Sequence, residues 1–390
     1  MRLRARQQQL DALLPRFQAL WHPQPFRELR PAWCERWPAL TAALLALDDD
    51  AASALNADSL AALATLACHI PEVAELLPLL DLSLRNPPPA KGDGERWAWE
   101  IPGRKRAQIE AFAAAACSDG QPVLDWCGGK GHLGRFLAHQ WQVPVRTLDI
   151  DTALCRAGER LAQRIGVPQE FISADALATD LPSAAGHHAV ALHACGELHR
   201  RLIRRGVEAG ITRFDVAPCC YHLHLGDAYR PQAALSSLLL TADDVRLAVT
   251  ETVTAGTRER RLRDRAMAFK LAFAAWRQQV SSCAYRSFKP VPETWMRGNF
   301  ADFMALMCHR EGIAPPGEGD LERYERRGVE RQREVFRLSI VRHAFRRAIE
   351  VWLAGDLAVS LEERGYAAEL GVFCARELTP RNLLISARRD

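Results

Sequence analysis

Short apolar runs alternate with amphipathic segments through the middle of the chain. In each amphipathic segment apolar residues recur three to four positions apart, which is the spacing of one helix face. Strands separated by helices predict a parallel sheet with helices on both faces, so we expect an α/β, Rossmann-like fold. The predicted strands are residues 122–126, 144–149, 169–173, 188–193 and 212–217, and the helices between them are 130–140, 152–165 and 197–209.

In the regions on either side, residues 1–85 and 226–360, apolar residues also recur three to four positions apart, which predicts helices. Asn86–Gly94 holds three consecutive prolines and two glycines, which predicts a linker. Apolar runs at 370–374 and 383–387 predict the last two strands of the sheet. The expected organisation is an N-terminal all-helical domain (1–90), a sheet domain (95–225 and 345–390), and a mostly helical insertion before the last strands (226–344).

Composition places the chain among ordinary globular proteins. Of its 390 residues, 48% are hydrophobic and 25% are charged. No apolar run is long enough to span a bilayer, and the first residues lack the apolar segment of a signal peptide, so we expect a cytoplasmic protein without a membrane partner. The 11 cysteines are scattered, which favours reduced thiols over a disulfide framework. A net charge of +4 is too small to indicate nucleic acid by itself.

A glycine-rich turn follows the first predicted strand. Gly128, Gly129 and Gly131 allow the chain to reverse sharply because glycine has no Cβ and tolerates positive φ. The helix that follows then directs its free N–H groups at whatever occupies the crevice. This arrangement is typical of a nucleotide-cofactor site.

Three carboxylates decide between two cofactors. The motif G-x-G-x-x-G, from Gly129 to Gly134, fits a dinucleotide such as NAD, but it is weak alone. Asp125, Asp149 and Asp175 follow three successive strands, where they could meet the α-ammonium group, the ribose and the adenine of S-adenosyl-L-methionine (SAM). We therefore expect SAM. The candidate cofactor-binding residues are Lys105, Asp125, Cys127, Gly128, Gly129, Gly131, Asp149, Ile150, Asp175, Ala176 and His193.

Positive charges occupy the first turn of the helix that begins near Pro102. Arg104, Lys105 and Arg106 stand where the helix dipole disfavours cations. A bound carboxylate, such as that of the donor's amino-acid end, would offset this cost. A solvated basic turn is the alternative.

Two further strand ends are rich in cysteine and histidine. His193–Leu198 follows one strand, and Pro218–His224 follows the next. In a first interpretation Tyr221 stacks on a flat acceptor, and His193 or His222 takes the proton that the acceptor releases.

Two alternatives concern the cysteines in these segments. His193, Cys195, Cys219, Cys220 and His222 include enough ligands for zinc, but neighbouring cysteines do not easily share a tetrahedral site and no C-x-x-C is present, so we assign no metal. Covalent catalysis by a thiolate would need an activator that the sequence does not reveal. The candidate catalytic residues are His193, Cys219, Cys220, Tyr221 and His222.

Three blocks, at 125–133, 192–198 and 219–222, resemble the signature blocks of the methyltransferase-like protein 25 family. They also resemble, more distantly, the acceptor-stem tRNA ribose methyltransferases. Residues 103–109, 361–366 and 378–387 are similar to other parts of that family. The resemblance implies a class I SAM-dependent methyltransferase, with Asp125, Gly129, Gly131, Asp149 and Asp175 at the donor site. Cys127 replaces the glycine usual at the start of the turn.

We expect an enzyme that transfers methyl directly to a nitrogen or oxygen of RNA, tRNA or rRNA. Arginines cluster at 258–265 and 323–333, where they could contact phosphates, although interleaved acids make a solvated surface the simpler interpretation. No DNA partner is expected, and the oligomeric state is not predicted. The alternatives are a methyltransferase for protein or small molecules, an NAD-dependent oxidoreductase, and a non-catalytic RNA-binding module.

Overall fold

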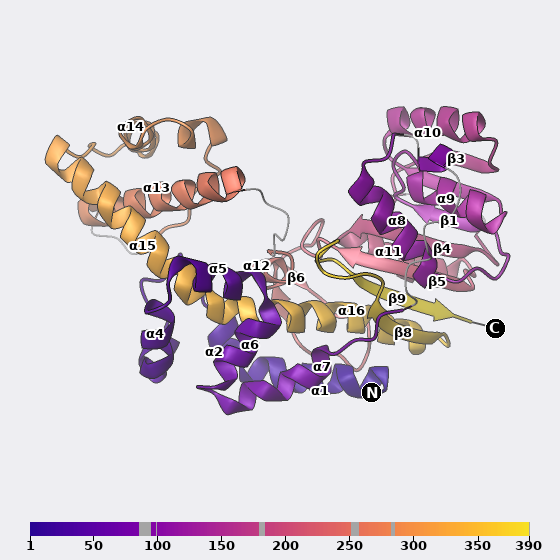
Figure 1. Cartoon of the computed structure of the whole chain (residues 1–390), viewed down its shortest axis with the longest axis horizontal. Helices are drawn as coiled ribbons and strands as arrows, with labels where there is room; N and C mark the ends of the chain where they lie inside the picture. The colour runs from indigo at the N-terminus through magenta and orange to yellow at the C-terminus, as the bar shows by residue number, and fades with distance from the viewer. Residues whose placement is uncertain (86–94, 99, 179–183, 251–256, 282–284, 390) are drawn as a thin grey trace. The chain divides into compact units, whose positions relative to one another are not determined.

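The computed structural model describes residues 1–85, 95–98, 100–178, 184–250, 257–281 and 285–389 (Figure 1). The predicted linker 86–94 lies outside them. The chain forms two compact units. The sheet unit comprises Met1–Arg16, Glu75–Val253 and Arg346–Asp390, and the helical unit comprises Phe17–Ala74 and Thr254–Phe345.

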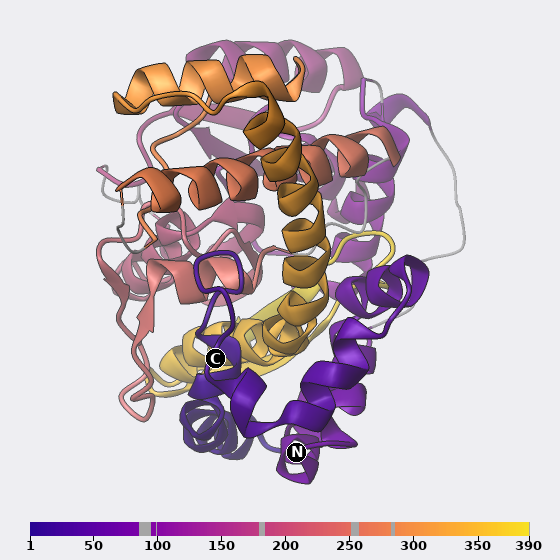
Figure 2. The same ribbon diagram turned by 90° about the vertical axis from the view of Figure 1, so that its left-hand side faces the viewer.

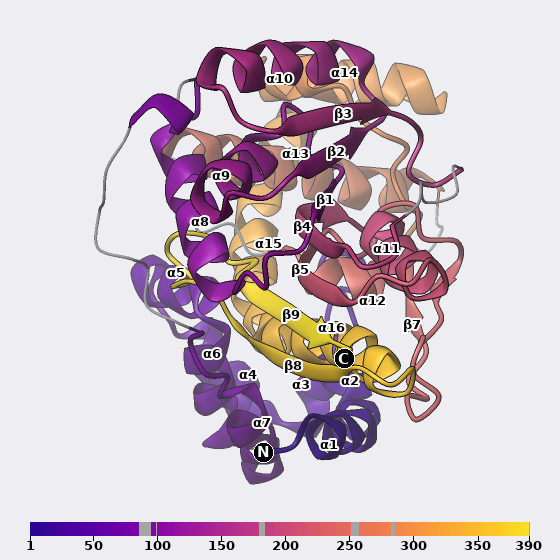
Figure 3. The same ribbon diagram turned by 90° about the vertical axis from the view of Figure 1, so that its right-hand side faces the viewer.

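A seven-stranded sheet forms the centre of the sheet unit. Its strands follow the order β3-β2-β1-β4-β5-β9-β8, as Figure 3 shows from top to bottom. The first five strands are parallel, and β9 runs antiparallel to both β5 and β8. The strands are β1 (Val123–Trp126), β2 (Val145–Asp149), β3 (Gln169–Ser173), β4 (His188–Cys195), β5 (Arg213–Cys219), β8 (Ala367–Val372) and β9 (Leu383–Arg388).

Helices cover both faces of this sheet. Successive side chains of a strand point to opposite faces. Asp125 accepts a hydrogen bond from the N–H of Gly134 in α9, whereas its neighbour Trp126 donates from Nε1 to the carbonyl of Leu198 in α11. The α/β fold with helices on both faces is therefore confirmed. The helices are α8 (Gly103–Ala115), α9 (His132–Trp141), α10 (Thr152–Ile165), α11 (Glu197–Glu208) and α16 (Arg346–Glu362).

The segment after β5 is fastened to the sheet unit by two carboxylates. Asp356 of α16 is completely buried and accepts hydrogen bonds from the N–H groups of Gln232 and Ala233. Asp11 accepts from the N–H of Ser237 at 3.0 Å. The remaining elements of this unit are α1 (Leu3–Arg16), η1 (Pro71–Leu76, shared with the helical unit), α7 (Leu77–Leu80), η2 (Glu95–Ala98), β6 (Ala228–Tyr229), β7 (Leu240–Thr241) and α12 (Ala242–Leu247).

The helical unit is built around α15. This helix packs against α13, and Gly328 permits the approach because a Cβ there would lie 2.5 Å from the carbonyl oxygen of Ala268. Figure 2 shows α15 as the long orange helix with α13 beside it. Its elements are α2 (Gln18–Trp21), α3 (Trp33–Arg36), α4 (Pro38–Leu45), α5 (Asp49–Ala57), α6 (Ser59–Ala67), α13 (Thr257–Ser281), η3 (Glu293–Met296), α14 (Phe300–Glu311) and α15 (Glu318–Ala344).

The grouping of helices differs from the three segments expected from the sequence. Residues 17–74 and 254–345 pack together, while α1 and residues 226–250 pack with the sheet. These units describe packing, and the division into domains at 90, 226 and 345 stays a prediction. Among the described residues, every helix is too short or too polar to span a bilayer.

Candidate active site

The turn between β1 and α9 is as tight as its glycines suggest. Cys127, Gly129 and Gly131 all have φ near +60°. A Cβ on Gly128 would lie 2.3 Å from Oδ2 of Asp125, and one on Gly131 would lie 2.3 Å from Nε2 of Gln169. Cys127 therefore adopts the conformation that glycine usually supplies, and larger residues at 128 and 131 would displace the side chains of Asp125 and Gln169.

Asp125 is a buried carboxylate at the end of β1. Its Oδ2 accepts from the N–H of Gly134 at 3.1 Å and from the hydroxyl of Thr147 at 3.2 Å. Burial raises the pKa of Asp125 to about 6, although both hydrogen bonds and the charge of Lys105 oppose the shift. A cation that enters the site would therefore find a carboxylate whose charge is only partly compensated.

The other two carboxylates organise their own loops. Asp149 accepts from the N–H of Gly129 at 2.8 Å and from that of Asp151 at 3.0 Å, so it joins the end of β2 to the glycine-rich turn. Asp175 is half-buried and accepts from the N–H of Leu177 at 2.8 Å.

A cavity of about 490 Å³ opens beside the turn. This volume is in the range of small-molecule sites. Its lining includes six predicted cofactor-site residues: Lys105, Asp125, Cys127, Gly128, Gly129 and His193. The other predicted site residues are not part of this lining: Gly131, Asp149, Ile150, Asp175, Ala176, Cys219, Cys220, Tyr221 and His222.

The three basic residues in the first turn of α8 make different contacts. Arg104 donates to the carbonyls of Leu378 and Glu377, and Arg106 pairs with Glu110. Arg104 and Lys105 both line the cavity, together with Asp125. Because Arg104 already donates to two backbone carbonyls, Lys105 is the better placed of the two to meet an anion.

His193 stands at the end of β4, on the wall of the cavity. Its φ is +65°, and the strand register shifts between Leu192 and Cys195. Burial lowers the pKa of His193 to about 4. The imidazole is therefore neutral at pH 7 and can accept a proton.

Backbone hydrogen bonds join the ends of β4 and β5. The N–H of Gly196 donates to the carbonyl of Cys219 at 3.0 Å, and that of Glu197 donates to the carbonyl of Leu223 at 3.1 Å. Leu223 also donates to Cys220 at 2.8 Å. The two cysteine- and histidine-rich segments form one rigid unit.

Tyr221 lies beneath this surface. Its side chain is completely buried, edge-on to His199 with ring centroids 5.4 Å apart. It presents no face for a stacked acceptor here. His222 is half-buried, and burial, followed by the charge of Arg246, lowers its pKa.

Three thiols meet where β4 and β5 end. The sulfurs of Cys195 and Cys219 are 3.5 Å apart, and those of Cys195, Cys219 and Cys220 all lie within 4.8 Å of one another. S–H hydrogen bonds from Cys195 and Cys219 lower the pKa of Cys220, while the pKa of Cys219 is raised. Hydrogen bonding thus favours the thiolate form of Cys220 over that of Cys219.

Some residues around the site escaped the sequence argument. Arg381, in the loop between β8 and β9, lies close enough for its charge to oppose protonation of His193 and His222, after larger effects of burial. The similarity of residues 378–387 to the methyltransferase-like protein 25 family could have pointed to Arg381. No feature of the sequence pointed to Gly196, because a lone glycine does not reveal which part of the backbone it approaches.

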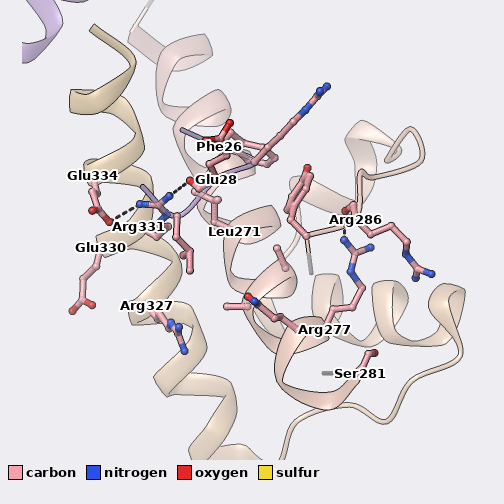
Figure 4. A pocket seen from close by; sticks show the side chains of 16 residues that line it. Phe26, Glu28, Leu271, Arg277, Ser281, Arg286, Arg327, Glu330, Arg331 and Glu334 are labelled. Atoms are coloured by element: carbon pink, nitrogen blue, oxygen red, sulfur yellow. Dashed lines mark hydrogen bonds and ion pairs between the residues drawn. The ribbon is translucent and has the colours of Figure 1, made fainter. Parts of the chain in front are cut away.

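A second cavity, of about 600 Å³, lies in the helical unit (Figure 4). Arg331 on its wall pairs with Glu334 and donates to the carbonyl of Glu28, as the dashed lines show. It also donates to the carbonyl of Pro25. Its guanidinium thus joins the segment around Phe26 to α15. None of the predicted catalytic or cofactor-binding residues lines this cavity, although Arg327 and Arg331 of the arginine cluster at 323–333 do.

Comparison with known proteins identifies the class. Residues 104–225 match a family described as "Methyltransferase domain". The chain is 30% identical over 124 residues to a glutathione S-transferase C-terminal domain-containing protein from Xenopus laevis, a match that covers 30% of this chain and 19% of the relative.

Solved structures also match parts of the chain. A SAM-dependent methyltransferase from Aquifex aeolicus is 14% identical, with 32% of this chain and 66% of that chain covered and a TM-score of 0.25. Geranyl diphosphate methyltransferase with geranyl diphosphate and sinefungin is 16% identical, with 35% and 54% covered and a TM-score of 0.27. Because these TM-scores and identities are low, the assignment to a class of protein rests on the family match and on the site itself.

Residues 104–225 are a SAM-dependent methyltransferase domain of class I. The match favours the methyl-donor interpretation of the three carboxylates over the NAD interpretation. The chain spans about a fifth of the length of the curated relative, so the activity of the whole protein is a separate question.

Proposed function

We propose that the protein is a SAM-dependent methyltransferase that acts on RNA, by direct transfer to a nitrogen or oxygen. The observation that carries this proposal is the cavity at the glycine-rich turn. The buried carboxylate of Asp125, the ammonium of Lys105 and the neutral imidazole of His193 all line it. The sequence resemblance to the methyltransferase-like protein 25 family and to the acceptor-stem tRNA ribose methyltransferases supports the same acceptor class.

The donor's charged end would meet two of the three charged side chains of this cavity, which are Asp125, Lys105 and Arg104. Asp125 would hold the α-ammonium group, and Lys105 would hold the carboxylate. Asp149 would hold the ribose hydroxyls, because each of its oxygens can accept more than one hydrogen bond. Ile150, Asp175 and Ala176 would contact the adenine. Glycine at position 128 leaves room for the carboxylate of Asp125, because a Cβ there would clash with it.

When bound, SAM supplies an electrophilic methyl group. The protein then has to position the acceptor in line and remove its proton. His193 is the candidate base because it lines the cavity and is neutral at pH 7. His222 is the second candidate. Since Tyr221 is buried, we assign it to supporting the loop rather than to stacking.

RNA binding would use the arginines of the helical unit. A groove along α13 is lined by Arg258, Arg261, Arg265 and Arg297, with Glu259 as its one acidic residue. Arg258, Arg261 and Leu262 recur at helical spacing, and both arginines are exposed. Such a row can follow a phosphate backbone.

The proposal is tested by incubating the protein with methyl-labelled SAM and total RNA. We expect label in RNA, and mass spectrometry of its nucleosides identifies the methylated position. Label found in protein or small molecules, with none in RNA, would refute the RNA acceptor. Absence of SAM binding would refute the proposal that the protein is a SAM-dependent methyltransferase.

Reversing the groove's charge should weaken RNA binding without changing donor binding. In Arg258→Glu/Arg261→Glu we expect the KM for RNA to rise about tenfold or more at low salt, because two phosphate contacts are lost. SAM affinity, measured by calorimetry, should stay unchanged. Arg323→Glu, at an arginine that pairs with Asp320, is the matched control. Equal KM values for RNA in the wild type, the double variant and the control would contradict the proposal that this groove binds RNA.

Removing the proposed base should stop transfer but not donor binding. We expect His193→Gln to reduce kcat by about 10²–10⁴, the usual contribution of a positioned base. The wild-type rate should fall as pH drops through the pKa of His193, about 4 in the free protein, because the imidazole must be neutral. His224→Gln, at an exposed histidine of the same loop, is the control. A His193→Gln enzyme with normal kcat would transfer the role to His222.

A further inference from the structure

We propose that Cys195, Cys219 and Cys220 form a binding site for a thiophilic metal ion, with Zn²⁺ as its occupant. The three sulfurs lie within 4.8 Å of one another, and none is in a disulfide. In a tetrahedral site with Zn–S bonds of about 2.3 Å, the sulfurs lie about 3.8 Å apart. The 3.5 Å between Cys195 and Cys219 is close to that value and far from a disulfide bond of about 2.05 Å.

The backbone explains how neighbouring cysteines share one site. Consecutive residues of a strand point in opposite directions, which would separate Cys219 from Cys220. Cys220, however, has a φ of +43°, so the alternation ends there. In β4 the register shift before Cys195 places its side chain opposite Cys219. One sequence argument against zinc was that neighbouring cysteines do not easily share a tetrahedral site, and these two irregularities remove that objection.

Backbone hydrogen bonds hold this irregular backbone in place. Positive φ is uncommon for residues other than glycine and is retained where the surroundings enforce it, often at functional sites. Hydrogen bonds from Leu223 to Cys220 and from Gly196 to Cys219 enforce it here. A preformed arrangement of this kind reduces the ordering that ligand binding requires.

Charge and access also suit a cation. Three thiols this close cannot all ionise unless a cation offsets their repulsion. Cys219 is buried, while Cys195 and Cys220 are half-exposed, so an ion can enter from their side. Three protein ligands leave a fourth position for water, as in sites whose zinc exchanges ligands.

Binding forms three Zn–S bonds and breaks the S–H bonds of the cysteines that are still protonated. Each released proton goes to the buffer, and zinc stays divalent. Affinity should therefore fall as pH decreases. The site does not require methyl transfer, so its test is independent of the proposed function.

The test uses the full chain, reduced and freed of metal, without SAM or RNA. We expect one equivalent of Zn²⁺ to bind in competition with a chromophoric chelator, and Co²⁺ to give a thiolate charge-transfer absorption. Cys220→Ser, at a half-exposed position, should weaken zinc binding about 100-fold or more. Cys68→Ser, at an exposed cysteine of the helical unit, should bind like the wild type.

Alkylation provides a second measurement that needs no variant. Zinc should protect Cys195, Cys219 and Cys220 from iodoacetamide and leave Cys68 reactive, as read by peptide mass spectrometry. Binding of less than one equivalent, normal binding by Cys220→Ser, or protection of other cysteines instead would overturn the proposal. So would a Cys195–Cys219 disulfide in the protein as isolated under reducing conditions.

Discussion

Asp125→Asn is expected to bind SAM about 10- to 100-fold more weakly than the wild type while folding at least as stably at pH 7. A charged hydrogen-bond partner contributes about 1.5–3 kcal/mol, and each 1.4 kcal/mol is a factor of ten. Asparagine keeps an oxygen that can accept from Gly134 and Thr147, so the turn is retained. Calorimetric titration with SAM measures the affinity, and urea denaturation measures the free energy of unfolding.

The stability part of this prediction follows from the raised pKa of Asp125, about 6 against an ordinary 3.8. Because the folded state holds this proton more tightly than the unfolded state, stability falls as pH rises between these two values. The ionised carboxylate thus costs about 3 kcal/mol above pH 6, and an amide does not incur this cost. SAM binding by the wild type should correspondingly weaken as pH falls below 6, whereas that of Asp125→Asn should change little.

Asp50→Asn, at an exposed position of α5, should leave both quantities unchanged. The assignment of Asp125 to the donor ammonium fails if the asparagine variant binds SAM normally at pH 7.5. It also fails if donor affinity shows no dependence on pH between 5 and 7. Loss of folding in the variant would instead contradict the calculated cost of the buried charge.

Periodicity was a good guide to the sheet, since β1–β5 lie within two residues of the predicted strands at each end. Parallel strands covered by helices on both faces have short, nearly continuous apolar runs, and these runs are easy to recognise between amphipathic helices. The carboxylates at strand ends followed from the same logic. Of the three, Asp125 lines the cavity, whereas Asp149 ends β2 and Asp175 lies in the loop after β3.

Features that depend on irregular backbone could not be predicted. The meeting of Cys195 with Cys219 and Cys220 needs a register shift and a positive φ, and neither has a signature in cysteine or histidine. Tyr221 looked like an exposed aromatic because it follows a strand, yet the loop turns its ring inward. Arg381 reaches the site from more than 150 residues away in sequence, so only the fold brings it near.

Gly196→Ala is expected to separate the two strand ends and abolish transfer while SAM binding persists. Gly196 has a φ of +58° and a ψ of −125°, which residues with a Cβ rarely adopt. Its Cβ would lie 2.0 Å from the carbonyl oxygen of Leu223, a backbone atom that cannot retreat without breaking its bond to Glu197. We expect a loss of about 3 kcal/mol or more in unfolding free energy, since strain and a clash add.

Gly186→Ala is the matched control, because Gly186 has a φ of +73° but open space around its missing Cβ. It should lose only about 1 kcal/mol, the cost of the conformation alone. The difference between the two variants therefore measures the contact between the strand ends rather than the preference of the backbone. Because Asp125 lies on β1 and the glycine-rich turn follows that strand, the Gly196→Ala variant should still bind SAM. Equal stability and activity of the two variants would mean that residues 219–224 are not held by Gly196, and that His193 and the three thiols owe their positions to something else.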